Sequence, residues 1–264
     1  MTDWQALKAA DYAVPAGAAL RPKVEELCQL LASPDPVQRD ELGYSVLATW
    51  LSREVLDAKL CHWLGDEMAD RMSAEDIWAR SFAALILDAL VSYGTFDPAW
   101  VPPFARWYAA ETDLRGYDPD LGWLHAVAHG ADLLGTLGLR PDLDPAAMLD
   151  LATRRLVAPT TAAWQDGEDE RLGHAIALTL TRSELSGQAS IAWVQAVEDS
   201  WTTRAPGPPP PWVSNAARTL RVVLGMTLTG ARPSGGVGAT RLVHEGAVQQ
   251  RVLSALHCLT PHMW

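Results

Sequence analysis

Apolar residues recur along the chain three or four positions apart, which places them on one face of a helix. Strict alternation of apolar and polar residues, the pattern of a half-buried strand, is almost absent. Short segments rich in proline, glycine and aspartate separate the helical stretches, and several offer an aspartate or serine cap followed by proline. The pattern therefore predicts an all-α fold.

Four of the expected helices share a high content of small residues. They begin at Leu42 (LGYSVLATWL), Arg80 (RSFAALILDAL), Leu124 (LHAVAHGADLL) and Leu172 (LGHAIALTLT), and a weaker fifth copy begins at Ala217. The first four starts lie 38, 44 and 48 positions apart, a period typical of HEAT-like helix pairs. Since one helix pair cannot bury its apolar face alone, successive pairs stack around a shared core. We expect a HEAT-like α-solenoid of about five helix pairs, with an irregular helical bundle as the alternative.

The repeats extend over most of the chain, so residues 1–264 are expected to form a single helical-repeat domain. Residues 204–212, with the sequence RAPGPPPPW, are expected to form an extended connection before the C-terminal helices, because proline-rich segments favour the polyproline II conformation. Residues 231–240, ARPSGGVGAT, have the composition of a flexible loop.

A surplus of acidic residues narrows the range of partners. The 264 residues include 32 Asp and Glu against 21 Lys and Arg, which gives a formal net charge of −11, and 48% are hydrophobic. This composition is that of a soluble globular protein. Because a negative field repels phosphate backbones, nucleic acid is not an expected partner, and a nucleic-acid repair protein of the HEAT-like type is the least favoured function.

The cysteines and the N-terminal residues indicate a cytoplasmic protein. The three cysteines show no CxxC spacing, so neither a disulfide framework nor a zinc ribbon is indicated. The first residues include acidic side chains and lack the apolar core of a secretory signal. No apolar stretch is long enough to span a membrane, so we expect no membrane association.

The segment GWLHAVAHGADLL, residues 122–134, is the strongest candidate for a functional site. On a helical wheel, His125, His129 and Asp132 fall within one wedge about 60° wide on an otherwise apolar helix. In the repeat register, Asp88 of the preceding copy occupies the same face and could add a carboxylate. The pattern therefore predicts a small polar pocket.

Three interpretations of this pocket are open. Two histidines four positions apart and an aspartate could bind a divalent metal, although the HExxH motif is not present and the sequence requires no cofactor. A histidine oriented by Asp132 could instead act as a general base. In the third interpretation the histidines bind a neighbouring loop, and Asp132 pairs with an arginine of the next repeat.

The polar turn before this segment, ETDLRGYDPDLGW, supplies further candidate ligand-binding residues. Asp113 and Arg115 could fold back over the start of the helix near His125, while Tyr117 and Trp123 could contact a ligand with their rings. Alternatively, an Asp–Arg ion pair fixes the turn.

The stretches DLRGY and GWLHAVAHGADLL closely resemble the signature of a bacterial family, the domain of unknown function 2785. The segments PDPVQRDELGYSVLATWL and EDERLGHAIALTL are also similar to that family, so the resemblance covers roughly residues 20–200. It implies a helical, HEAT-like protein and implies no particular activity.

These observations favour a binding or scaffold protein. Its concave face, with the polar His/Asp pocket, would hold a protein or small-molecule partner. The alternative is a metal-assisted or histidine-dependent hydrolase that uses His125, His129 and Asp132.

Overall fold

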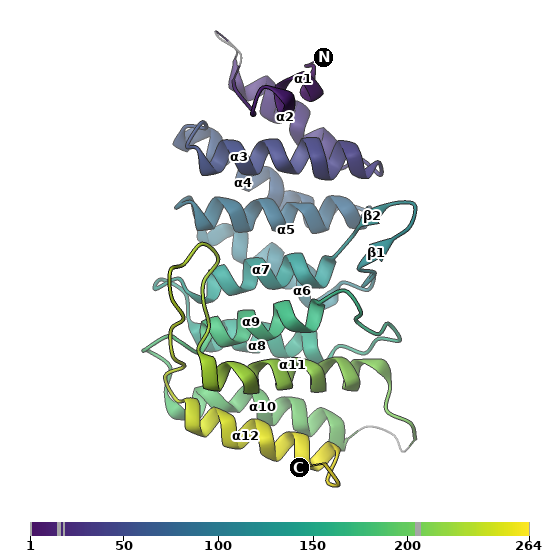
Figure 1. Cartoon of the computed structure of the whole chain (residues 1–264), viewed down its shortest axis with the longest axis vertical. Coiled ribbons are helices and arrows are strands. Elements are labelled where there is room, and N and C mark those ends of the chain that lie inside the picture. Colours follow the sequence, from purple (N-terminus) through teal and green to yellow (C-terminus); the bar gives the residue numbers. More distant parts are fainter. Residues whose placement is uncertain (1, 15–16, 18, 204–206, 264) are drawn as a thin grey trace. The chain divides into compact units, whose positions relative to one another are not determined.

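The computed structural model describes residues 2–14, 17, 19–203 and 207–263, which are mostly helical (Figure 1). Within these residues the chain forms twelve α-helices, one π-helix, one 3-10 helix and two strands of two residues each. The prediction of an all-α fold is confirmed. None of the helices in the described part of the chain is both long enough and apolar enough to cross a membrane.

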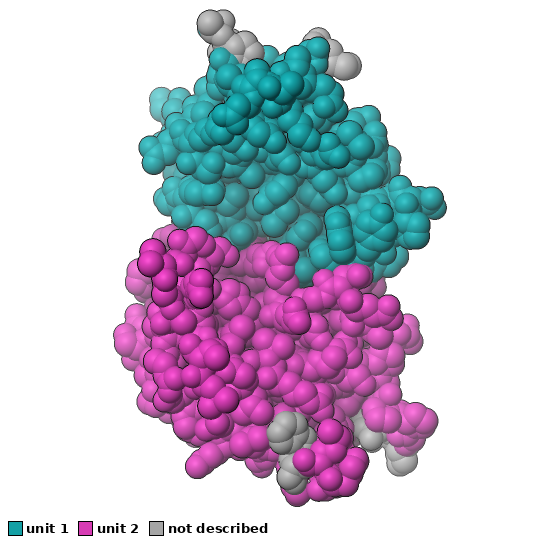
Figure 2. All heavy atoms as spheres, viewed as in Figure 1, with its two compact units in different colours: residues 1–107, 115–130 teal, residues 108–114, 131–264 magenta. Residues whose placement is uncertain are grey.

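The chain divides into two compact units, which Figure 2 shows in different colours. Unit 1 comprises residues 1–107 and 115–130, and unit 2 comprises residues 108–114 and 131–264. The unit boundary therefore falls within two of the helices, α6 (Val101–Ala110) and α7 (Ala126–Gly138). That the whole chain forms a single repeat domain stays a prediction.

Unit 1 contains the N-terminal helices and a small hairpin. Besides the first parts of α6 and α7, its elements are α1 (Trp4–Ala9), α2 (Leu20–Leu31), the π-helix η1 (Val37–Tyr44), α3 (Ser45–Ser52), α4 (Ala58–Arg71), α5 (Ile77–Ser92), the 3-10 helix η2 (Pro98–Trp100), β1 (Tyr117–Asp118) and β2 (Gly122–Trp123). Helix α5 packs against α2, α3 and α4, and η1 packs against α2 (Figure 1). Trp50 and Phe82 lie in the resulting apolar core.

Unit 2 contains the helices α8 (Pro145–Val157), α9 (Glu168–Thr179), α10 (Gly187–Thr202), α11 (Pro211–Thr229) and α12 (Glu245–Leu259). Helix α10 packs against both α8 and α12, while α9 packs against α11 (Figure 1). Small residues permit these close approaches, because a Cβ added at Gly173 would lie 2.7 Å from a methyl carbon of Val222. Helix α11 also packs against α8 and α12, and α8 packs against α9.

Within each unit, arginine side chains connect a helix or its C-terminal end with the helix two before it in the chain, by binding backbone carbonyls. Arg71 donates to the carbonyl of Cys28, 43 positions earlier, in unit 1. In unit 2, Arg155 donates to the carbonyl of Glu111 at 2.8 Å, and Arg182 donates to that of Gly138 at 3.1 Å, each 44 positions earlier. These separations agree with the period found in the sequence.

Several element boundaries in the structure differ from those predicted from the sequence. Leu42 lies in η1, and the α-helix of that repeat begins at Ser45. Of the predicted proline-rich connection 204–212, residues 204–206 lie outside the described residues, and residues 211 and 212 already belong to α11, because proline fits the first turn of a helix. The ends of the predicted loop 231–240 are joined by two backbone hydrogen bonds between Ala231 and Thr240.

Candidate functional site

A hairpin in unit 1 occupies the stretch between the polar turn and the two histidines. Strands β1 and β2 are antiparallel, with Tyr117 opposite Trp123 and Asp118 opposite Gly122. The Asp118 carboxylate accepts hydrogen bonds from the amides of Asp120 and Leu121, both at 3.0 Å. These amides, together with Arg115, lower the pKa of Asp118, so the side chain remains an anion in the turn.

Gly122 is required by the hairpin for two reasons. Its φ of +71° lies in the left-handed region, which L-residues with a side chain seldom adopt. In addition, a Cβ at this position would lie only 2.8 Å from the Cβ of Pro36. The hairpin therefore packs directly against the residues that lead into η1.

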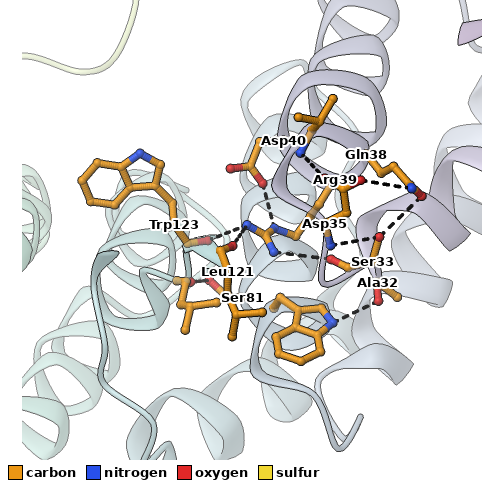
Figure 3. Close-up of polar contacts among 12 residues, drawn as sticks. Ala32, Ser33, Asp35, Gln38, Arg39, Asp40, Ser81, Leu121 and Trp123 are labelled. Carbon is orange, nitrogen blue, oxygen red and sulfur yellow. Dashed lines mark hydrogen bonds and ion pairs between the residues drawn. The ribbon is translucent and has the colours of Figure 1, made fainter. Parts of the chain in front are cut away.

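A buried arginine holds the hairpin in place. The side chain of Arg39 on η1 is fully buried, and its Nη2 donates to the carbonyls of Leu121 at 2.7 Å and Trp123 at 3.2 Å (Figure 3). Its Nε donates to the Asp40 carboxylate at 2.7 Å, and Nη1 donates to the carbonyl of Ser33 at 3.4 Å. One cation thus joins η1, the residues that follow α2 and the β2 side of the hairpin turn.

His125 does not lie on the helical face that the wheel predicts. Its φ of +45° places it in the left-handed region, and α7 begins one residue later. The backbone carbonyl of His125 accepts a hydrogen bond from the amide of His129 at 2.9 Å, so His125 caps the helix. The prediction that His125, His129 and Asp132 share one helical wedge is therefore wrong for His125, which lies before the first residue of α7.

The His125 ring is stacked on the hairpin. Its centroid lies 4.3 Å from that of Trp123, at an interplanar angle of 32°. The ring of His129 meets it at 5.6 Å and 83°. Both histidines are at least nine-tenths buried, so they support the hairpin from its buried side.

His129 forms a buried hydrogen bond with Ser81 of α5. The distance between His129 Nδ1 and Ser81 Oγ is 2.8 Å, and the Ser81 hydroxyl also bonds the carbonyl of Leu124. Because a hydroxyl has a single proton and the carbonyl can only accept, the proton on Nδ1 points toward Ser81 Oγ. Ser81 is fully buried, and its hydroxyl donates its single proton to the carbonyl of Leu124. It is therefore a positioning residue and is unsuited to be a nucleophile.

Asp132 belongs to unit 2, where its carboxylate forms an ion pair with Arg171 at the start of α9. This is the pairing with the next repeat that the third interpretation predicts. The box of residues 122–134 thus divides between the two units, and its polar groups make contacts within each unit.

Among the described residues, no group of three or more His, Cys, Asp or Glu side chains is arranged to hold a metal ion. His129 is bound to Ser81 and Asp132 to Arg171, which are contacts that a metal would have to replace. Metal binding at these residues stays a prediction.

The other predicted site residues are distributed as follows. Arg115 pairs with Asp118 at 2.7 Å, so an Asp–Arg ion pair does fix the turn. The amide of Asp113, in unit 2, donates to the buried Glu111 carboxylate at 2.9 Å. Asp88 is half-buried on α5, two turns after Ser81.

Tyr117 and Trp123 are the predicted candidates that the hairpin presents on the surface. Tyr117 is 53% exposed and Trp123 is 41% exposed, and their ring centroids lie 5.0 Å apart. In Figure 3 the indole of Trp123 points away from the guanidinium of Arg39. The rings therefore form an exposed aromatic pair, the hairpin surface, on a backbone that is fixed from the buried side.

The sequence did not indicate a role in the site for two of its residues. Arg39 lies in the charged segment PDPVQRDELGY, where nothing marks it as buried, and Ser81 looks like an ordinary small helical residue. A signal for the hairpin was present, because the sequence Tyr117–Trp123 contains a Pro-Asp turn and a glycine between two aromatic residues.

Comparisons with known proteins identify a family. The profile of a family described as a protein of unknown function, DUF2785, matches residues 69–224, more than half of the chain. The match confirms the family resemblance seen in the sequence, and it includes Ser81, the hairpin and both histidines. Neither the curated proteins nor the solved structures gave a match.

Proposed function

We propose that this chain, which belongs to the DUF2785 family of proteins of unknown function, is a helical-repeat protein that binds a protein partner through the hairpin surface. The observation that carries the proposal is the exposed pair of Tyr117 and Trp123 on a hairpin whose carbonyls are held by the buried Arg39.

The residue types on the hairpin surface are those that dominate protein interfaces. Tyrosine, tryptophan and arginine are enriched among residues whose truncation costs the most binding energy. The hairpin carries one of each, Tyr117, Trp123 and Arg115, and the side chain of Arg115 is about half exposed. A surface of this composition is suited to contact a protein.

Rigidity of the hairpin is the second support. A two-stranded hairpin is marginally stable by itself in water. Here Gly122 and Arg39 fix its backbone and His125 supports the Trp123 ring, so little conformational entropy is lost when a partner binds. The buried histidines then contribute to binding by positioning the surface.

We further propose that each unit is a stack of HEAT-like helix pairs. Within unit 2, α8, α10 and α12 pack in succession, and α9 packs against α11. The arginine–carbonyl hydrogen bonds recur at separations of 43 and 44 positions, as repeated units require. This proposal covers the packing inside each unit.

The alternatives from the sequence have less support. A hydrolase would need an accessible base or nucleophile, whereas His129 and Ser81 are buried and bonded to one another. A nucleic-acid binder would need a cationic surface, and the chain has a net charge of −11. Both functions stay predictions.

Site-specific photo-crosslinking tests the proposal. Tyr117 is replaced by p-benzoylphenylalanine in cells that produce the protein, and Tyr93 is replaced in parallel as the control. Tyr93 is 56% exposed at the end of α5 in the same unit, so it matches Tyr117 in exposure. We expect a discrete adduct with another protein from position 117 and not from position 93. Equal adducts from both positions, or none from position 117, would contradict the proposal.

A further inference from the structure

We infer that the partner of the hairpin surface is a basic protein segment, whose lysine or arginine side chains sit over the Trp123 ring and beside the carboxylates of the turn. This inference rests on the proposed function and adds the chemical class of the partner. It is carried by the aromatic geometry and by the charge around the hairpin.

Part of the Trp123 side chain is accessible to a cation. One side of the Trp123 indole is covered by His125 at 4.3 Å, and Tyr117 meets the indole at an angle of 70°. The Trp123 residue nevertheless remains 41% exposed. Tryptophan is the strongest partner in cation–π contacts, because its large ring system carries the most negative face.

The residues around the pair carry an excess of negative charge. The two segments that form this part of unit 1, residues 35–44 and 115–125, contain five Asp and Glu but only two Arg. Both arginines are already paired, Arg39 with Asp40 and Arg115 with Asp118. Glu41 is paired with Lys8 at 2.8 Å, so Asp35 and Asp120 are the carboxylates of these two segments that lie outside these ion pairs.

Asp120 is the carboxylate best placed for such a cation. It is exposed at the tip of the turn, two residues before Gly122, and its backbone amide is bound to Asp118. No ion pair of Asp120 occurs in the part of the chain that the structure describes. The turn thus fixes the backbone of Asp120 and leaves its charge on the surface.

The net charge of unit 1 also favours a basic partner. Unit 1 contains 18 Asp and Glu against 10 Lys and Arg, so it carries −8 of the chain's net charge of −11. A field of this sign raises the local concentration of basic segments and accelerates their association. It repels acidic proteins and nucleic acids, which favours a basic protein segment as the partner.

Peptide binding by the full chain tests the inference. The probe is a fluorescein-labelled peptide of alternating arginine and glycine, followed by fluorescence anisotropy, and a glutamate–glycine peptide of equal length is the control. The variants are Trp123→Leu, which keeps apolar area and removes the aromatic face, and Asp120→Asn. Their matched controls are Tyr93→Leu and Glu75→Gln, at exposed positions elsewhere in unit 1.

We expect the basic peptide to bind and the acidic peptide not to bind. Trp123→Leu should weaken binding by about 5- to 30-fold, the range of a cation–π contact of about 1–2 kcal/mol. Asp120→Asn should weaken binding by about 2- to 5-fold at low salt and less at high salt, as expected for an exposed charge. The two control variants should bind as the unaltered chain does.

Trp123→Phe keeps an aromatic face, so it separates loss of the cation contact from loss of folding in the leucine variant. If Trp123→Leu loses both binding and its cooperative unfolding transition, Trp123→Phe should retain the fold and most of the affinity. Equal binding by all variants would show diffuse charge attraction and would overturn the inference, as would no binding by the unaltered chain.

The outcomes also separate this inference from the proposed function. Discrete crosslinks from position 117 without affinity for the basic peptide would leave the protein-binding function standing and overturn the basic partner. Peptide binding that depends on Trp123, without any crosslink from position 117, would support the cation site and contradict the protein-binding function.

Discussion

The guanidinium of Arg39 donates a hydrogen bond to the carbonyl oxygen of Trp123, 84 positions later in the chain, at 3.2 Å. The same Nη2 donates to the carbonyl of Leu121 at 2.7 Å. A side chain in the N-terminal part of unit 1 thereby determines the position of the hairpin surface, although it is itself completely buried.

Replacement of Arg39 by methionine should destabilise the protein by about 2–4 kcal/mol, because buried carbonyls and the Asp40 carboxylate lose their donor. Urea denaturation measures this change. The control is Arg53→Met, which removes an exposed pair with Asp11 and should cost less than about 1 kcal/mol. An effect of Arg39→Met as small as that of the control would show that the hairpin is held by other contacts.

Ser81 and His129 should be energetically coupled. His129→Phe keeps the ring packing against Phe82 but cannot form the 2.8 Å hydrogen bond with Ser81. A double-mutant cycle with Ser81→Ala should give a coupling energy of about 1 kcal/mol. His62→Phe, at an exposed ring, should show no coupling to Ser81→Ala. Strictly additive effects at Ser81 and His129 would contradict this structural role.

Gly122→Ala should destabilise the hairpin more than a comparable change elsewhere. Both the positive φ and the 2.8 Å approach to Pro36 oppose a side chain at this position. Gly94 also has a positive φ but faces open space, so Gly94→Ala isolates the backbone strain, about 1 kcal/mol. We expect Gly122→Ala to lower the free energy of unfolding by about 1–2 kcal/mol more than Gly94→Ala. Equal effects would mean that Pro36 moves aside freely.

The three cysteines should differ in their reaction with iodoacetamide. Burial raises the pKa of Cys28 to about 12 and also raises that of Cys61, so neither should react in the native state. Cys258 is exposed, but its Sγ donates to the Glu198 carboxylate at 2.9 Å, which raises the thiol pKa. Glu198→Gln should lower that pKa and accelerate labelling of Cys258 at pH 8, which peptide mass spectrometry can follow. Unchanged labelling would exclude the thiol–carboxylate contact.

Glu168 should make the stability depend on pH. It is almost fully buried at the start of α9, and burial raises its pKa above the ordinary value. A group with a raised pKa in the folded state favours folding below its unfolded pKa and loses that contribution as the pH rises through the folded pKa. Glu168→Gln should therefore raise the melting temperature relative to the unaltered chain at pH 8, and the difference should shrink toward pH 4. Glu170→Gln, at an exposed position of the same helix turn, is the control.

The helices and their caps could be predicted because their signals are local. Pro145 at the start of α8 follows Asp144, whose side chain caps the helix as the sequence indicates. The interval between the segments rich in small residues was also visible, and the arginine–carbonyl bonds span separations of similar size. Each of these features depends on residues near one another or on one recurring interval.

The details of the hairpin could not be predicted because they depend on distant partners. Strands of two residues are too short to show alternation, and no local pattern pairs Arg39 with Leu121. The left-handed backbone of His125 also leaves no sequence signature beyond the tolerance of histidine for that region, so a regular helical wheel does not apply at this residue.

The arginines that connect a helix with the one two before it bind main-chain oxygen atoms, as Arg155 does at Glu111 and Arg182 does at Gly138. Every residue type carries such an oxygen, so the receiving position is free to change its side chain while the connection persists. If the helix pairs are repeats, as we propose, their side chains can differ from pair to pair while the connections between the helices persist.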